Sequence, residues 1–175
     1  IRVVVSVDPA ATSEEGSNET GIIGAGLGVD EHGYVLEDAT MKGTPAEWGE
    51  KAVMLYDRLG ADRLVAETNN GGDMVEHVIK TAARDLWLRG KRPTQHIAYK
   101  KVHASRGKHT RAEPVAALDE QGRIHHVGML GPLEDQLCTW VPGEDSPDRL
   151  DARVWACTEL MPKLKPQRQA ESHQG

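Results

Sequence analysis

The segment Ile1–Asp8, with the sequence Ile-Arg-Val-Val-Val-Ser-Val-Asp, decides the fold of this chain. Its residues from Arg2 to Val7 form a nearly continuous β-branched apolar run, which is typical of a central strand buried on both faces of a sheet. The run ends in a carboxylate, Asp8, at a place where a buried charge is costly unless a partner compensates it. We therefore expect Asp8 to lie at the carboxyl end of a central strand.

Other acids stand in comparable positions far away in the sequence. Glu67 ends a second apolar run that begins at Arg63, and Asp148 and Asp151 stand in the segment Ser146-Pro-Asp-Arg-Leu-Asp-Ala152. In that segment we expect Ser146 as the helix cap and Pro147 as the first helical residue. Asp148 and Asp151 are three residues apart, so they project from one face of this helix, in the positive first turn that favours anions.

The remaining periodicity predicts an alternation of strands and helices. Thr44-Pro-Ala-Glu47 is a capping box with proline at the first helical position, and Gly60 ends that helix. We expect strands at 2–7, 21–29, 34–39, 63–67 and 95–99, with a short extended piece at 124–127. We expect helices after Thr44, at 73–88, around 111–119, within 130–140, and from Pro147 onward.

This order of elements, β-β-β-α-β-α-β-α, matches the RNase H-like fold. The expected class is α/β, with a five-stranded mixed sheet in which an antiparallel meander is extended by parallel strands and flanked by helices. The first strand is central and the fourth lies beside it, so Asp8 and Glu67 become neighbours at the carboxyl ends of parallel strands, where open α/β sheets bind ligands. We expect one domain over residues 1–162 and a disordered tail over 163–175.

Carboxylates that gather in one place need a cation, because buried like charges repel one another. Oxygen ligands, with few histidines in the strands, favour Mg²⁺ or Mn²⁺ over zinc. Two such ions about 4 Å apart can activate a water and stabilise the leaving oxygen of a phosphodiester. We expect Asp8 to bridge both ions and Glu67 and Asp151 to hold one each, with Asp148 assisting; whether Asp148 or Asp151 is the direct ligand is left open. Each acid taken alone could also have a purely structural role, as Asp8 would have in an ordinary strand-end turn with Pro9.

Positive charge is concentrated in one stretch, although the net charge of the 175 residues is −6. No acid occurs from Leu86 to Ala112, and this stretch contains eight lysines and arginines. Such a strip is a candidate for binding phosphate groups; the alternative is a solvated loop and helix face. The candidate phosphate-binding residues are Lys100, Lys101, Arg106, Lys108 and Arg111.

Several functions are disfavoured by what the sequence lacks. No apolar run approaches the roughly 20 residues that span a bilayer, so we expect no membrane partner and no secretion. No Gly-x-x-x-x-Gly-Lys-Ser/Thr phosphate loop occurs, so no nucleotide-hydrolysing motor is expected in these residues. The chain opens directly in a strand without methionine, which suggests a fragment or a processed chain.

Together these motifs resemble the C-terminal nuclease domain of the large terminase subunit of tailed bacteriophages. The similarity extends from Ile1 to Met161, and the acids at both ends of it are shared by RNase H-like nucleases in general. The inner sequence segments, above all Glu67-Thr-Asn-Asn-Gly-Gly72 and Leu133-Glu-Asp-Gln-Leu137, are what make the resemblance specific to this family. The blocks are Val3–Ala10, Val65–Val75, Lys108–Leu118, Gly122–Gly128 and Ser146–Ala156.

The resemblance implies metal-dependent cutting of concatemeric double-stranded DNA during genome packaging. It also implies an ATPase motor domain upstream of Ile1, a portal protein and a small terminase subunit as partners, and a location in the cytoplasm of the infected bacterial host. Asp8, Glu67 and Asp151 match the acidic triad of the family, and Asp148 matches a variable position beside it. The strip from Lys100 to Arg111 would form part of the DNA path.

Two other functions fit the same residues. A Holliday-junction-resolvase-like nuclease shares the fold and cuts branched DNA. A non-catalytic DNA-binding module would retain the fold while its acids bind no metal.

Overall fold

The structure is a computed structural model, and it describes residues 1–9, 19–67, 72–103, 108–141, 144 and 147–161. The side chains of residues 72, 108 and 109 are not included in this description. The predicted tail at 163–175 and the predicted DNA-binding residue Arg106 lie outside the described residues, as does the helix cap expected at Ser146.

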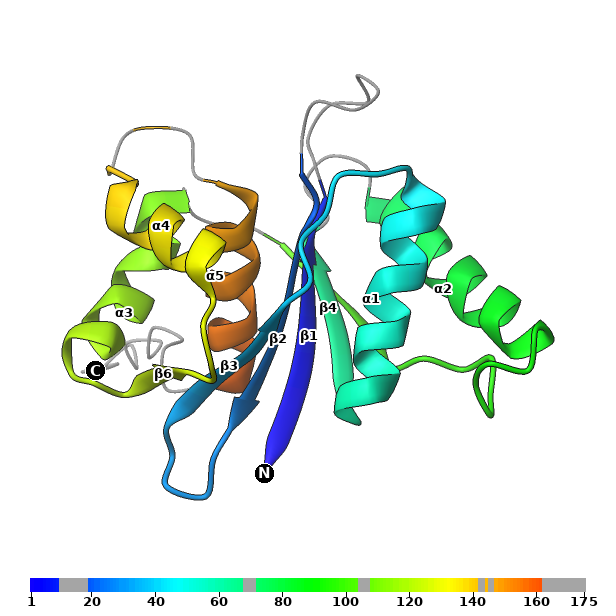
Figure 1. Cartoon of the computed structure of the whole chain (residues 1–175), viewed down its shortest axis with the longest axis horizontal. Helices are drawn as coiled ribbons and strands as arrows, with labels where there is room; N and C mark the ends of the chain where they lie inside the picture. Colours follow the sequence, from blue (N-terminus) through cyan, green and yellow to red (C-terminus); the bar gives the residue numbers. More distant parts are fainter. Residues whose placement is uncertain (10–18, 68–71, 104–107, 142–143, 145–146, 162–175) are drawn as a thin grey trace, which may run out of the picture.

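A six-stranded mixed sheet forms the centre of the molecule, with the strand order β5-β4-β1-β2-β3-β6 (Figure 1). Strands β1 to β3 form an antiparallel meander, while β4 runs parallel to β1, β5 parallel to β4, and β6 parallel to β3. The strands are β1 Arg2–Asp8, β2 Gly21–Leu27, β3 Gly33–Asp38, β4 Arg63–Glu67, β5 Tyr99–Val102 and β6 Ile124–His126.

Helices cover both faces of this sheet. Figure 1 shows α1 and α2 on one side, and α3, α4 and α5 on the other. Each side has its own apolar core: Val5 and Val7 of β1 pack toward α1 and α2, while Val4 packs toward α5. The helices are α1 Pro45–Leu59, α2 Gly72–Leu88, α3 Lys108–Glu120, α4 Gly131–Thr139 and α5 Asp148–Leu160.

The predicted fold class is confirmed. Strand β1 is central, with β2 antiparallel on one side and β4 parallel on the other. The capping box of α1 is formed in both directions between Thr44 and Glu47, and Gly60 ends the helix in the left-handed conformation with φ of 58°.

Three details of the sequence prediction were wrong. The sheet has six strands instead of five, because Ile124–His126 pairs in parallel with β3. Strand β5 runs from Tyr99 to Val102, four residues beyond the predicted start, because this edge strand tolerates the polar Lys100 and Lys101 that follow the apolar signal. Pro147 occupies the cap position of α5 and makes no side-chain capping bond, so it is not the first helical residue.

None of the described helices is long and apolar enough to cross a membrane.

Candidate metal centre

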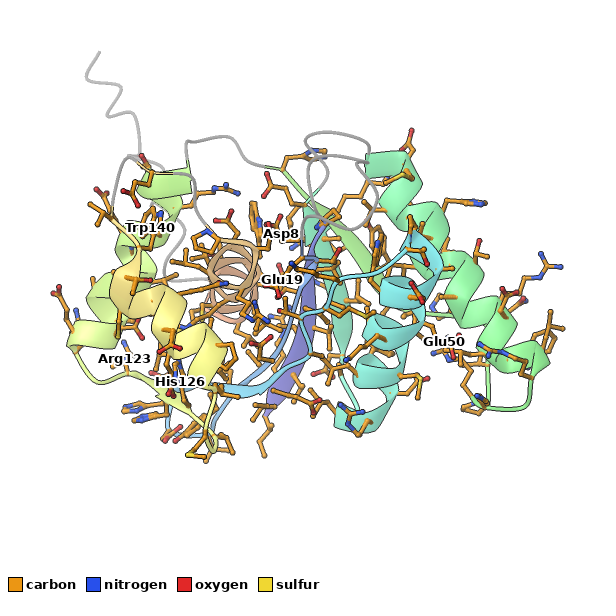
Figure 2. The ribbon with its side chains drawn as sticks, turned by 45° about the horizontal axis from the view of Figure 1, so that its top comes forward. Asp8, Glu19, Glu50, Arg123, His126 and Trp140 are labelled. Atoms are coloured by element: carbon orange, nitrogen blue, oxygen red, sulfur yellow. The ribbon has the colours of Figure 1, made fainter. Side chains whose placement is uncertain are left out.

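Asp8 lies at the carboxyl end of the central strand, on the face that α5 covers. The hydroxyl of Ser6 donates a 2.6 Å hydrogen bond to the carbonyl of Ala152 in α5. Side chains alternate along a strand, so Asp8 shares that face with Ser6. Asp8 is only 7% exposed, and Figure 2 shows it at the end of β1 beside α5. The structure therefore places this carboxylate where the sequence predicted it.

Glu67 ends the neighbouring parallel strand at the same level. Val7 pairs with Ala66 in the β1–β4 ladder, so Asp8 and Glu67 are the next residues along the two strands. The carboxylate of Glu67 also turns toward α5, because its Oε2 accepts a 2.7 Å hydrogen bond from the indole Nε1 of Trp155. The predicted adjacency of these two strand ends is confirmed by the pairing of β1 with β4.

Helix α5 presents one stripe of polar side chains to the sheet. Asp151, Trp155 and Glu159 follow at intervals of four residues, so they lie on one face of the helix. Trp155 contacts the end of β4 through Glu67, and Asp151 lies one turn nearer the start of the helix. Asp151 is 3% exposed, so its carboxylate belongs to the buried side of the helix. Three carboxylates from β1, β4 and α5 thus share one face at one end of the sheet.

The start of α5 is held against the sheet by close backbone packing. A Cβ atom added to Gly21, the strand partner of Asp8, would lie 2.1 Å from the carbonyl oxygen of Asp148. The guanidinium of Arg149 in the first turn also binds Asp38 at the end of β3, with a distance of 2.9 Å, and Glu19 before β2. These contacts fix the first turn of α5, which contains Asp148 and Asp151, relative to the sheet.

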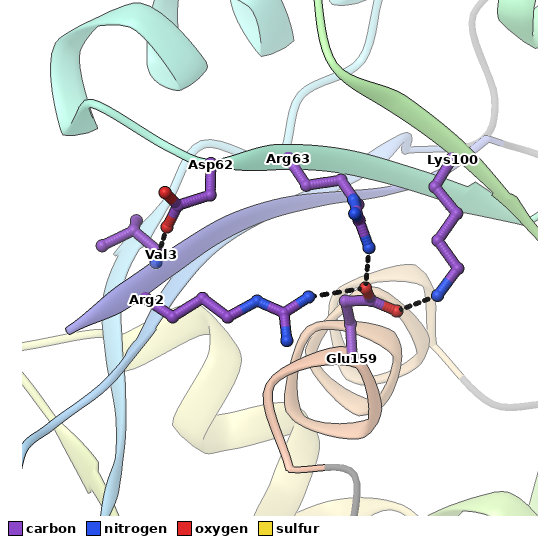
Figure 3. A network of polar contacts seen from close by, with 6 residues as sticks. All are labelled: Arg2, Val3, Asp62, Arg63, Lys100 and Glu159. Atoms are coloured by element: carbon purple, nitrogen blue, oxygen red, sulfur yellow. Dashed lines mark hydrogen bonds and ion pairs between the residues drawn. The ribbon is translucent and has the colours of Figure 1, made fainter.

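The other end of the polar stripe is an ion-pair hub. Glu159 receives Arg2 from β1 at 3.0 Å, Arg63 from β4 at 2.8 Å and Lys100 from β5 at 2.7 Å (Figure 3). Burial raises the pKa of Glu159, but the hydrogen bonds from Lys100 and Arg63 outweigh it, so the pKa lies below its usual value. The hub joins α5 to three strands and thereby fixes the orientation of the helix.

The carboxylate oxygens suit a hard divalent cation, since the set contains no thiolate and no imidazole. This donor chemistry fits Mg²⁺ or Mn²⁺. Among the residues that the structure describes, however, no three His, Cys, Asp or Glu side chains form a ready-made group that could hold a metal ion. Glu67 is turned toward Trp155 and Arg111, the latter at 3.1 Å. The assignment of Asp8, Glu67, Asp151 and Asp148 as ligands therefore stays a prediction.

The predicted DNA-binding residues are divided among different surroundings. Lys100 pairs with Glu159 on the α5 face, whereas Lys101 pairs with Asp73 and Glu76 of α2, each at 2.8 Å, on the opposite face. Arg111 pairs with Glu67. Lys108 begins α3. Neighbouring lysines on a strand point opposite ways, so Lys100 and Lys101 lie on different surfaces. The role of the strip in DNA binding stays a prediction.

Some residues that shape this site were not found from the sequence. One of them is Trp155, whose indole donates a hydrogen bond to Glu67. Its spacing of four residues from Asp151 is the signal that could have revealed it. Ser6, Gly21 and Glu159 gave no such signal, because their contacts join elements far apart in the chain.

Sequence comparison decides the family. The profile of the family described as "Terminase RNaseH-like domain" matches residues 5–161. The chain belongs to the terminase RNase H-like domain family. The matched residues include all four predicted acids, and membership of this family supports a nuclease function.

Solved structures of the same fold include phage terminase nucleases. The nuclease domain of the large terminase subunit gp2 of bacterial virus Sf6 is 16% identical, with a TM-score of 0.62 over 89% of this chain and 87% of that chain. The large terminase nuclease of a thermophilic phage, with bound zinc, is 16% identical, with a TM-score of 0.60 over 90% and 81%. A variant of the Sf6 domain was solved with manganese, and another structure of it with calcium.

A junction resolvase also shares the fold. The yeast mitochondrial Holliday junction resolvase Ydc2 is 13% identical, with a TM-score of 0.54 over 92% of this chain and 79% of that chain. At these identities the likeness concerns the fold alone. In one large terminase of a thermophilic bacteriophage, the matched region covers 39% of that protein. Among curated proteins, no relative with significant similarity is found.

Proposed function

We propose that this chain is the metal-dependent endonuclease of a terminase, which hydrolyses DNA phosphodiester bonds and cuts concatemeric viral double-stranded DNA during genome packaging. The observation that carries the proposal is the placement of Asp8, Glu67 and Asp151 on one face at one end of the sheet. Membership of the terminase family supports the same conclusion.

Mg²⁺ or Mn²⁺, with two ions expected, would be held by Asp8, Glu67 and Asp151, with Asp148 as an additional ligand. When bound, divalent ions activate a water and stabilise the departing oxygen of the phosphodiester. Asp8 stands at the end of the central strand, next to the strand that ends in Glu67, so we expect it to serve both ions. The terminase structures with manganese, calcium and zinc are consistent with the use of a divalent metal.

The protein positions these acids through rigid elements. Asp8 and Glu67 belong to hydrogen-bonded strands in the middle of the sheet, and Asp151 belongs to a helix fixed by Ser6, Arg149 and Glu159. Sites built on strands and helices hold their ligands more accurately than sites built on loops. Rigid elements would therefore fix the carboxylates that would hold the metal ions.

The partners that follow from this function are proposals as well. Double-stranded DNA is the substrate, and an ATPase motor domain, a portal protein and a small terminase subunit complete the packaging assembly. The work takes place in the cytoplasm of the infected bacterial host.

The decisive experiment compares two aspartates. Asp8→Asn should abolish plasmid cleavage with Mn²⁺ while circular dichroism shows an intact fold. Asp62→Asn is the matched control, because Asp62 accepts a 2.8 Å bond from the Val3 amide at the opposite end of the sheet and lies on the exposed surface. The control should cut as the wild type does; retained cutting by Asp8→Asn refutes the metal role.

The likeness to Ydc2 makes a resolvase the second candidate. Comparing cleavage of linear duplexes with cleavage of four-way junctions separates the two nucleases, since a resolvase prefers the junction. A module without catalysis would bind DNA but release no carboxylate-dependent heat on calorimetric titration with manganese or calcium.

A further inference from the structure

Glu67 is engaged by two donors from two different helices. Its Oε2 accepts from Trp155 Nε1 at 2.7 Å and from Arg111 Nη1 at 3.1 Å. The guanidinium of Arg111 also lies over the indole of Trp155, with 4.5 Å between its Cζ and the ring centroid. Arg111 thus closes over the strand end where a predicted metal ligand stands.

This arginine supplies positive charge at a place rich in buried negative charge. The side chains of Arg111 and Glu67 are each 12% exposed, and Asp8 and Asp151 are both buried. Buried carboxylates need a positive counter-charge. Arginine supplies a permanent one, because its guanidinium does not lose its proton in proteins. Arg111 neutralises Glu67 in this structure.

Within the described residues, Arg111 is nevertheless not fully hydrogen-bonded. Its Nε is buried and finds no hydrogen-bond acceptor in the part of the chain that the structure describes. It stands in the first turn of α3, and Pro114 follows inside the same helix. Proline has no amide hydrogen, so the carbonyl of Thr110 lacks its usual helical partner and the first turn is joined less firmly to the rest. The turn that carries Arg111 is therefore less constrained than a regular helical turn.

We propose that Arg111 is a displaceable counter-ion, which leaves Glu67 when a divalent cation takes over the neutralisation and then binds a phosphate of the DNA backbone. The inference rests on the proposed function. A guanidinium and a divalent cation beside one carboxylate repel each other, so they compete for Glu67. Once it has left Glu67, the planar guanidinium of Arg111 can donate two parallel N–H bonds to the oxygens of a phosphate.

The exchange couples metal binding to DNA binding. Without DNA, the ion pair with Arg111 lowers the affinity for the metal; with DNA present, the phosphate accepts the arginine and the metal binds more tightly. Linkage is reciprocal, so the metal must raise DNA affinity by the same factor. The nuclease would then bind its ions firmly only when DNA is present to be cut.

The first test measures Mn²⁺ affinity without DNA by isothermal titration calorimetry. Arg111→Ala and the bulkier Arg111→Gln should both bind Mn²⁺ more tightly than wild type, by at least about fivefold, the lower end of typical coupling between sites. Arg89→Ala is the matched control, because it also removes one ion-paired arginine, from Glu50 on the far side of the molecule. Its Mn²⁺ affinity should equal that of the wild type, and thermal melting should show that all variants fold.

The second test measures DNA affinity by fluorescence anisotropy in Ca²⁺ and in EDTA. Ca²⁺ should strengthen DNA binding by wild type more than by Arg111→Ala. If Mn²⁺ binding depends on Asp8 but Arg111→Ala leaves it unchanged or weaker, Arg111 only positions Glu67 and this inference is overturned, while the proposed function stands. If Mn²⁺ binding does not depend on Asp8, the proposed function and the inference are both overturned.

Discussion

The hydroxyl of Ser6 donates to the carbonyl of Ala152 at 2.6 Å, and this single bond links the strand that ends in Asp8 to the helix turn that contains Asp151. Ser6 stands two residues before Asp8, and Ala152 directly follows Asp151. A second, longer contact of 3.3 Å connects the same hydroxyl to the carbonyl of Ile23 in β2. Two acids that are 143 positions apart in the sequence are thereby kept at a fixed separation.

Replacing Ser6 with alanine should weaken this link. We expect Ser6→Ala to lower the free energy of unfolding by about 1 kcal/mol, the usual net value of a buried hydrogen bond, as measured by urea denaturation. Thr158→Ala is the control, because the hydroxyl of Thr158 donates to Val154 of its own helix. That variant should stay within about 0.5 kcal/mol of wild type. Equal effects of the two substitutions would contradict a special role for the bond across elements.

Gly21 allows α5 to approach the sheet, so Gly21→Ala should displace the start of that helix. The added Cβ would lie 2.1 Å from a backbone oxygen of Asp148, which cannot rotate away. We expect a loss of about 1–3 kcal/mol in stability, typical of overpacking, together with weaker Mn²⁺ binding. Gly26→Ala on the same strand meets its nearest atoms at 3.6 Å and should be tolerated. Thermal melting and calorimetry check both, and normal Mn²⁺ binding by Gly21→Ala would contradict the expectation.

The Glu159 hub gives the fold a pH dependence. The pKa of folded Glu159 lies below the unfolded value of 4.5, so its contribution to stability is present above 4.5 and is lost as the pH falls through the folded pKa. Glu159→Gln should cost about 2 kcal/mol near neutral pH, as expected for hydrogen bonds to a charged group. The difference from wild type should shrink as the pH falls below 4.5.

Urea denaturation of both proteins across this range measures the difference. A gap between wild type and Glu159→Gln that stays constant down to acid pH would show that the charge of Glu159 does not stabilise the fold.

The two neighbouring lysines of β5 should contribute unequally to DNA binding. Lys100 lies on the face of the candidate metal centre, whereas Lys101 is paired with Asp73 and Glu76 on the other face. Lys100→Ala should reduce the salt dependence of DNA affinity by about 0.9, the value of one lost phosphate contact. Lys101→Ala should leave that slope unchanged. Equal reductions by both substitutions would place the whole strip on the DNA path.

Much of the fold was predictable because its signals are local. The apolar run of β1, the capping box at Thr44 and the acids that end β1 and β4 are all legible within a few residues. Together with the order of elements, they predicted the central strand, its parallel neighbour and the shared end where Asp8 and Glu67 lie.

The errors and omissions have a common physical cause. Strand β6 and the extent of β5 depend on edge pairing, which has little sequence signature when the strand is short or polar. The Trp155 and Arg111 contacts with Glu67 depend on how α3 and α5 pack together. The basic residues follow one another in the sequence, but the alternation of side chains along β5 places Lys100 and Lys101 on opposite faces.

The central claim is that Asp8, Glu67 and Asp151 converge on divalent ions. The most direct measurement is anomalous scattering from a crystal soaked in Mn²⁺. We predict one or two strong peaks bounded by carboxylate oxygens of these three residues, at the end of β1 beside the first turns of α5. Strong Mn²⁺ peaks elsewhere, with these three carboxylates bound to no ion, would contradict the claim.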